Sequence, residues 1–187
     1  VLRESGGDPA DIAVCGISNQ RETMLLWDAD GAPLHNAVVW QCKRPVDICA
    51  RLGGSSTEDH IKRKTRLIVD PYFSGTKVIW LKENVPAIAT AIDSGAARFG
   101  TVDTWLLHRL TNGAEYRTDF TNACRTLFFN IDTLTWDMEL LDEFGLSGLM
   151  LPECSASASA FGTTDFEGAL PVAVPVGAMI GDSHASA

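Results

Sequence analysis

The sequence predicts an α/β domain with a mixed β-sheet and flanking helices, as its composition and the order of its apolar segments both indicate. Of its 187 residues, 45% are hydrophobic and 21% are charged, which is typical of a globular domain rather than of a disordered or fibrous chain. Short apolar runs come first and later alternate with segments of helical periodicity. This order indicates a meander of strands followed by strands that pack against helices, in one sizeable domain.

The first strands are marked by short runs rich in β-branched residues. Residues 12–17 predict a buried strand that ends in the polar segment 18–23. Residues 24–27 and 37–40 predict a hairpin, because Gly31 lies in the turn between them and can adopt a positive φ angle.

Helices are expected in the middle of the chain, over residues 45–52, 58–64, 74–85 and 86–95. In the first of them, Val46, Cys49 and Leu52 share a face, and the glycines that follow end the helix. The second is mostly polar and is expected at the surface. Pro86 separates the last two helices, because proline breaks a helix but is tolerated in its first turn.

The second half of the chain alternates between the two element types. Strands are predicted at 99–102, 126–131 and 172–180, and helices follow the first two of these strands. Asp103 and Thr104 are expected to cap one helix, with Leu106, Leu107 and Leu110 facing inward, and Thr135 is expected to cap the helix at 136–144. The Ser/Ala-rich run 155–160 predicts a loop.

Charge and apolar patterning exclude two classes of partner. The formal net charge is −9, and no basic cluster is longer than Lys62-Arg63-Lys64, so nucleic acid is not an expected partner. The longest apolar stretch, residues 170–180, is broken by Pro and Gly and is too short to span a membrane. The chain starts without a basic and apolar leader, so a secretory precursor is not expected.

The cysteine pattern favours reduced thiols and a cytoplasmic location. Five cysteines are odd in number and form no CxxC pair, and the four histidines are scattered relative to them. We therefore expect no metal site.

Three polar clusters interrupt apolar surroundings, at residues 19–23, 70–77 and 181–184. Each follows a predicted strand or opens a predicted helix, and ligands in open α/β sheets bind at the carboxyl ends of strands. Arg21 and Glu22 place a hydrogen-bond donor beside an acceptor, which suits the hydroxyls of a polyol. Taken alone, however, the two residues favour a surface ion pair.

Asp182 and Tyr72 can each be interpreted as a structural or as a functional residue. Asp182 lies between a strand and a helix, so its carboxylate can cap the helix or act as a general base. Tyr72 can hydrogen-bond a ligand through its phenol or pack in the core. His184 is expected to be a surface or packing residue.

Five segments in order resemble the FGGY carbohydrate kinases, and the glycerol kinases among them. Tyr72–Asn84 resembles the first FGGY pattern over its whole length. The other four segments are 18–23 (family ITNQRET), 38–44 (IVWQDRR), 99–107 (FGTIDTWLI) and 118–130 (TDYSNASRTMLFNI). The resemblance runs in order from Asp11 to the last residue, and chance agreement of five ordered motifs is implausible.

The resemblance implies an actin-like, RNase H-like kinase fold of two lobes, with the acceptor in the cleft and Mg-ATP as phosphoryl donor. By motif position, it implies that Arg21, Glu22, Tyr72 and Asp182 hold glycerol. Trp40 would pack against the carbon side, and Asp182 would be the base. The parent enzyme would transfer the γ-phosphate of ATP to a primary hydroxyl.

Two departures from the family pattern matter. The family GDQQAA is here Gly181-Asp182-Ser183-His184-Ala185-Ser186, so Ser183 replaces a glutamine that helps to bind glycerol. In the family KTGL pattern, Arg66 replaces the glycine. A kinase for another polyol or sugar is therefore an alternative acceptor assignment.

The nucleotide-binding parts of the family are absent from residues 1–187, both the upstream DxGTTSxR phosphate loop and the downstream ATP-binding lobe. We therefore interpret the chain as a partial N-terminal, substrate-binding domain. It is expected to bind no cofactor tightly, to be inactive by itself, and to need the C-terminal lobe as partner, with homo-oligomers possible. A non-catalytic polyol-binding or assembly module is the alternative from a different class.

Overall fold

The computed structural model describes residues 2–187, with side chains from residue 4 onward. The strands are β1 (Cys15–Asn19), β2 (Met24–Trp27), β3 (Arg98–Thr101), β4 (Arg117–Asp119), β5 (Phe129–Asn130), β6 (Thr135–Trp136), β7 (Glu153–Ser155), β8 (Thr163–Thr164) and β9 (Val174–Gly181). The helices are α1 (Leu2–Ser5), α2 (Val46–Leu52), α3 (Ser56–Thr65), α4 (Ser74–Asn84), α5 (Pro86–Asp93), α6 (Val102–Leu110), α7 (Phe120–Ala123), α8 (Met138–Glu143) and α9 (Asp182–Ala185), with a 3₁₀ turn at Pro9–Asp11.

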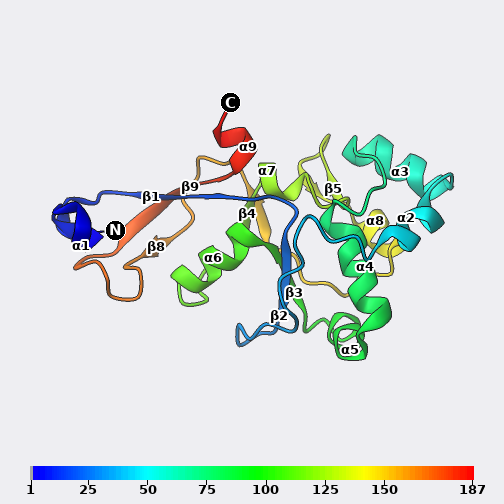
Figure 1. Ribbon diagram of the computed structural model, residues 1–187, viewed down its shortest axis with the longest axis horizontal. Helices are drawn as coiled ribbons and strands as arrows, with labels where there is room; N and C mark the ends of the chain where they lie inside the picture. The colour runs from blue at the N-terminus through cyan, green and yellow to red at the C-terminus, as the bar shows by residue number, and fades with distance from the viewer. Residues whose placement is uncertain (1) are drawn as a thin grey trace.

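The β-structure is mixed, as the sequence predicts. β9 pairs with β1 in parallel and with β8 in antiparallel orientation. Three two-stranded pairs complete it: β2 with β3 antiparallel, β4 with β7 parallel, and β5 with β6 antiparallel. β1 and β9 run side by side along one half of the molecule, and α9 emerges from the end of β9 (Figure 1).

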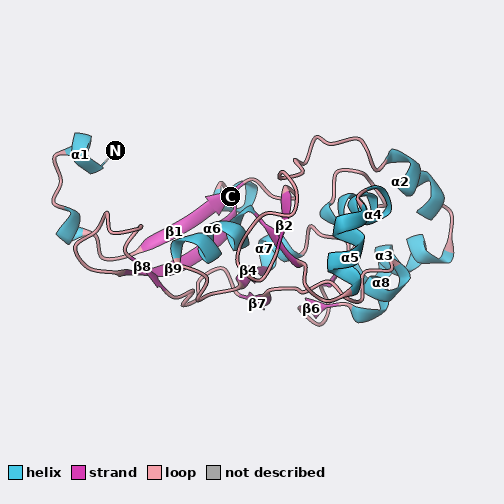
Figure 2. Ribbon diagram, turned by 90° about the horizontal axis from the view of Figure 1, so that it is seen from below, coloured by secondary structure: helices cyan, strands magenta, loops and turns pink. Residues whose placement is uncertain are grey.

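The molecule has two hydrophobic cores, and each stabilises one half of it. The larger core lies among α2, α3, α4, α5, α8, β2 and β3, where Ile48, Ile61, Val78, Ile92 and Phe99 are buried. These helices cluster at one end of the molecule (Figure 2). The smaller core packs Leu107 of α6 against the β1–β9 sheet, through Ile17, Val176 and Met179. Helix α6 therefore covers the apolar side of this sheet.

Several strands differ from the sequence prediction. The first strand begins three residues later than predicted, at Cys15. The predicted hairpin is reduced to isolated bridges, of which Met24 with Val38 is one, because β3 is the regular partner of β2. Only residues 129–130 of the predicted strand 126–131 pair with a neighbour, and the short strand β4 and helix α7 before them were not predicted.

The predicted helix caps and buried faces also need correction. Thr101 rather than Asp103 precedes α6, and Asp137 rather than Thr135 caps α8 through the amide of Leu140. Asp103 is buried in the first turn of α6, where its carboxylate accepts hydrogen bonds from the hydroxyls of Thr101 (2.5 Å) and Thr118 (2.6 Å). Apolar spacing predicted that Val46 and Leu106 lie on buried helix faces, but both side chains are exposed.

Candidate functional site

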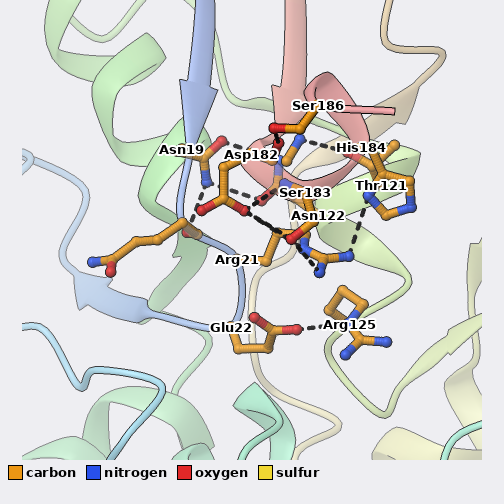
Figure 3. Close-up of polar contacts among 12 residues, drawn as sticks. Asn19, Arg21, Glu22, Thr121, Asn122, Arg125, Asp182, Ser183, His184 and Ser186 are labelled. Atoms are coloured by element: carbon orange, nitrogen blue, oxygen red, sulfur yellow. Dashed lines mark hydrogen bonds and ion pairs between the residues drawn. The ribbon is translucent and has the colours of Figure 1, made fainter.

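The parallel pairing of β1 with β9 brings two of the polar clusters together. In this register Asn19 lies opposite Gly181, so the residues after each strand leave the sheet at the same edge. The chain continues into Gln20, Arg21 and Glu22 on one side and into Asp182 and Ser183 on the other. Figure 3 shows Arg21 and Glu22 converging with Asp182 and Ser183 from the two strands. The sequence predicts this convergence, since carboxyl ends of parallel strands meet at one edge.

A small pocket of about 130 Å³ lies at this edge. It is lined by Gln20, Arg21, Glu22, Trp40, Tyr72, Asp182 and Ser183. The five residues singled out in the sequence are therefore neighbours in space, although Arg21 and Asp182 are 161 positions apart. The pocket combines a guanidinium, two carboxylates, a phenol and an indole.

Arg21 is directed toward the residues that follow β9. Its Nη2 donates to Ser183 Oγ at 3.0 Å, and its Nη1 lies 3.2 Å from His184 Nδ1. The Nε atom is 4.0 Å from Asp182 Oδ1 and has no hydrogen-bond partner. Gly181 makes room for this arrangement, because a Cβ there would lie 2.6 Å from Arg21 Cγ. Arg21 thus keeps an unused N–H beside the pocket.

Glu22 is buried, with 1% of its surface exposed, and its ion partner is Arg125. Arg125 Nε donates to Glu22 Oε1 at 2.6 Å. The interpretation of Arg21 and Glu22 as a surface ion pair is therefore wrong, because each side chain has a different partner. Burial of this carboxylate is tolerated since the guanidinium neutralises it.

The backbone at Glu22 is unusual. Thr23 N donates to Arg21 O at 2.7 Å, which closes a three-residue turn, and Glu22 in the centre has φ 62°. Non-glycine residues rarely adopt positive φ, and such conformations cluster at functional sites. Ser74 Oγ donates to Glu22 O at 2.9 Å and ties the turn to α4. Within this turn Arg21 donates to Ser183 and Glu22 accepts from Arg125, so the two side chains contact different partners.

An aromatic wall closes one side of the pocket. The rings of Trp40 and Tyr72 meet edge to face with centroids 5.7 Å apart, and Trp40 is 37% exposed. Tyr72 lies between this ring and Phe73. Burial raises the pKa of the Tyr72 phenol, and the nearby Glu22 carboxylate raises it further. The phenol is therefore a neutral hydrogen-bonding group that can donate to a ligand.

Asp182 is the first residue of α9, and 55% of its side chain is exposed. Gly181 occupies the N-cap position, so the interpretation of Asp182 as the N-cap is wrong. Oδ1 accepts from Ser183 N at 2.7 Å and lies 3.4 Å from Ser183 Oγ. One carboxylate oxygen is thus held by the following residue, and the carboxylate remains open to the pocket.

A buried polar network beneath the pocket fixes the start of α9. Gly181 N donates to Thr121 Oγ1 at 2.8 Å, and that hydroxyl donates to Asp119 Oδ2 at 2.7 Å. Asp119 also accepts from Asn122 Nδ2 at 2.8 Å, and Asn122 exchanges hydrogen bonds with Asn19 at the end of β1. The network links the ends of both strands to α7 (Figure 3).

Sequence reasoning placed Asp119, Thr121, Asn122 and Arg125 in a family-like segment but gave them no role. Asp119 accepts from the amides of Thr121 and Asn122 and so caps α7. A helix of four residues is too short for its periodicity to be recognised, although an Asp at its start is a typical capping signal. No local pattern indicates the pairing of Arg125 with Glu22, 103 residues apart.

Lys77 was not assigned a role either, and it lies buried behind Tyr72. Its Nζ donates to the backbone oxygens of Tyr72 and, at 3.1 Å, of Phe73. Burial lowers the pKa of Lys77 to about 8, although negative groups such as Glu22 and Asp70 oppose the shift. Lys77 therefore supports the segment that carries Tyr72.

The depressed pKa of Lys77 predicts a pH dependence of stability. Between about 8 and 10.5 the unfolded lysine binds its proton while the folded one releases it, so this group makes the free energy of unfolding rise with pH. Burial raises the pKa of the Cys124 and Cys154 thiols and acts in the opposite direction.

The test compares the free energy of unfolding of wild type with that of Lys77→Met, both measured by urea unfolding across this pH range. Wild type should gain stability relative to the variant as pH rises. A difference independent of pH would show that the Lys77 pKa is not depressed.

Metal ligation, disulfides and membrane spans find no support in the described part of the chain. Among residues 2–187, no group of three His, Cys, Asp or Glu side chains is placed to hold a metal ion. All five cysteines are free thiols. In the same range, no helix is both long and apolar enough to cross a bilayer.

Comparisons with known proteins agree on one family. All of residues 1–187 match the model of the N-terminal domain of the FGGY family of carbohydrate kinases. Glycerol kinase of Symbiobacterium thermophilum is 44% identical over 187 residues, and glycerol kinase 1 of Thermotoga maritima is 46% identical over 187 residues. The chain is fully covered in both, but it spans only 37% and 38% of their lengths.

Solved structures extend the similarity to the fold. Plasmodium falciparum glycerol kinase with ADP superposes with a TM-score of 0.86 at 36% identity, over 94% of this chain and 35% of that one. A gluconate kinase from Lactobacillus acidophilus matches with a TM-score of 0.85 at 23% identity, over 99% of this chain and 37% of that one. The predicted actin-like kinase fold with a mixed sheet and flanking helices is confirmed.

Proposed function

Because this chain belongs to the FGGY family of carbohydrate kinases, we propose that it is the substrate-side part of an ATP-dependent kinase that phosphorylates a primary hydroxyl of glycerol. The observation that carries the proposal is the convergence of Arg21, Glu22, Trp40, Tyr72 and Asp182 on one pocket. The relatives named above are glycerol kinases with this chain fully covered at 44% and 46% identity, which supports glycerol as the acceptor.

The pocket residues suit the two sides of a glycerol molecule. Arg21 donates from its guanidinium, and Glu22 accepts from a hydroxyl with the oxygen that Arg125 leaves free. The Tyr72 phenol both donates and accepts. The Trp40 indole covers the C–H side, since an exposed aromatic face loses water when it packs on carbon. A volume of about 130 Å³ matches a small acceptor better than a larger sugar.

We assign proton transfer to the carboxylate of Asp182. This group lies beside the pocket and would accept the proton of the attacking hydroxyl as its oxygen bonds to the γ-phosphorus, while the bond from that phosphorus to ADP breaks and ADP leaves. Arg21 and Glu22 hold the polyol so that one primary hydroxyl points at this carboxylate. Positioning of this kind supplies much of the acceleration in phosphoryl transfer.

Mg-ATP belongs to the complete protein in this proposal. This chain's own part of the reaction is to bind, orient and deprotonate the acceptor. Nucleotide and metal would supply the phosphoryl group and the charge that neutralises it.

Alanine substitution of the two polar pocket residues tests the acceptor site in the complete protein. Arg21→Ala and Glu22→Ala should each weaken glycerol binding by about 1–3 kcal/mol, because each leaves a hydroxyl or a pocket group unpaired. The KM for ATP should stay the same. Arg66→Ala is the matched control, since Arg66 forms an exposed ion pair with Asp132 away from the pocket.

Another polyol or sugar is the second candidate acceptor, and Ser183 favours it. Ser183 Oγ accepts a hydrogen bond from Arg21. The serine side chain is shorter than that of the glutamine in the family pattern, so it makes fewer contacts with glycerol. If Arg21→Ala and Glu22→Ala leave the glycerol KM unchanged but raise that of a tetritol or pentose, the acceptor is one of these and not glycerol.

The isolated 187-residue chain should show no ATP-dependent phosphorylation of glycerol, because nucleotide and metal positioning supply most of the rate. A coupled assay for ADP release measures this. Saturable turnover by the purified chain would contradict the assignment of catalysis to two lobes.

The isolated chain should also self-associate through the apolar surface that would face the other lobe. Light scattering measures this, and a monomer at high concentration would contradict the expectation.

A further inference from the structure

We propose that a second cavity, at the end of the domain away from the polyol pocket, binds an oxyanion group of a small metabolite. The cavity has a volume of about 430 Å³ and is lined by Ala29, Asp30, Gly31, Arg98, His108, Arg109, Asn112 and Gly113. It shares no residue with the polyol pocket. The turn after β2, which carries Gly31, lies at the opposite edge of the molecule from α9 (Figure 1).

Two guanidinium groups face this cavity without an acidic partner. Arg98 begins β3, and Arg109 lies in the last turn of α6. In the part of the chain that the structure describes, neither is within ion-pairing distance of a carboxylate, and Arg98 Nε is buried without a hydrogen-bond partner. Arg98 lies over the ring of Tyr116 at 5.5 Å and Arg109 over that of Trp105 at 5.9 Å.

His108 adds a buried imidazole ring to the lining of the cavity. Only 5% of the residue is exposed, and its Nδ1 is buried without a hydrogen bond. The Nε2 edge faces Gly31, since a Cβ on that glycine would lie 3.2 Å from Nε2. Burial lowers the pKa of His108, a hydrogen bond to the Glu115 backbone opposes this shift, and the charges of Arg98 and Arg109 add to it. An oxyanion in the cavity would therefore meet the Nε2 edge of this ring rather than the buried Nδ1.

The local electrostatics favour an anion over a cation. Two arginines oppose the single carboxylate of Asp30, whereas the chain as a whole has a net charge of −9. The carbonyl groups at the end of α6 would repel an anion, but they are occupied: Gly113 N donates to His108 O at 2.8 Å, and Asn112 N donates to Arg109 O at 3.2 Å. Guanidinium groups match the paired oxygens of phosphate and carboxylate.

Tryptophan fluorescence of the complete protein tests the proposal without an activity assay. Trp27 and Trp105 lie 5.7 and 6.3 Å from the His108 ring, so a ligand on His108 should change their emission. Inorganic phosphate, ethyl phosphate and acetate are titrated separately, with chloride at matched ionic strength as the salt control. We expect a saturable change with at least one oxyanion, and the response to each identifies phosphate or carboxylate as the preferred group.

Variants assign the signal to the cavity. Arg98→Gln with Arg109→Gln should weaken the apparent affinity at least about tenfold, because charged hydrogen bonds are lost. His108→Phe keeps the ring packing and should also weaken it. Arg63→Gln, which changes the charge on α3 outside the cavity, should bind like wild type. The absence of a saturable change with all three anions, or equal affinity in the double arginine variant with an unchanged melting temperature, would overturn the proposal.

Discussion

Replacing Asp182 by Asn in the complete protein is expected to lower kcat by about 10²–10⁴-fold with little change in stability. The loss follows from removal of a general base, whose contribution to rate has this typical size. Stability should hardly change, since the side chain is 55% exposed and its amide replacement can still accept from Ser183 N. The melting temperature should therefore shift by no more than about one or two degrees.

The control for this experiment is Asp132→Asn, which removes a carboxylate of similar exposure, 61%, outside the pocket. This variant should keep the wild-type kcat. Retention of more than about a tenth of kcat in Asp182→Asn would be too small a loss for a base. Asp182 would then be a substrate-positioning residue at most.

Replacing Arg125 by Met is expected to destabilise the protein by about 3–5 kcal/mol, because it leaves the Glu22 carboxylate buried without its partner. Glu22 is 1% exposed and receives the Arg125 Nε at 2.6 Å. The guanidinium also lies 4.8 Å from the centre of the Phe73 ring, so part of the loss comes from packing. Denaturant unfolding measures the change.

A double-mutant cycle separates charge from packing at this pair. Glu22→Gln in the Arg125→Met background removes the unpaired charge and should recover much of the stability, while glycerol binding stays weak. Arg51→Met is the matched control, because the pair of Arg51 with Glu83 has similar contact geometry at 2.5 Å but is solvent-exposed. The Arg51→Met substitution should lower the free energy of unfolding by no more than about 1 kcal/mol. Equal losses for Arg125→Met and Arg51→Met would show that burial of Glu22 is not decisive.

The sequence predicted the parts of the site that depend on strand ends. The residues after β1 and β9 were placed at a common edge because both segments read as buried strands with polar ends, and the register of Asn19 opposite Gly181 brings them together. The resemblance to the family then assigned Trp40 and Tyr72 to the same site. These predictions follow from backbone periodicity and from motif order.

The remaining features depend on contacts between distant residues. Arg125 reaches Glu22 across 103 positions, and Thr121 reaches Gly181 across 60. No local period encodes such pairings. The same limit explains the misjudged faces of α2 and α6: Val46 and Leu106 fit the apolar spacing, but in the described structure both are substantially exposed. A tertiary neighbour decides whether an apolar stripe is covered.

The most direct test of the proposed acceptor site is a crystal structure of the complete protein with glycerol. We predict hydroxyl groups within hydrogen-bonding distance of Arg21 and Glu22, the carbon chain against Trp40, and a primary hydroxyl beside the carboxylate of Asp182. Glycerol bound away from the edge formed by β1 and β9, with these side chains free of ligand, would contradict the account.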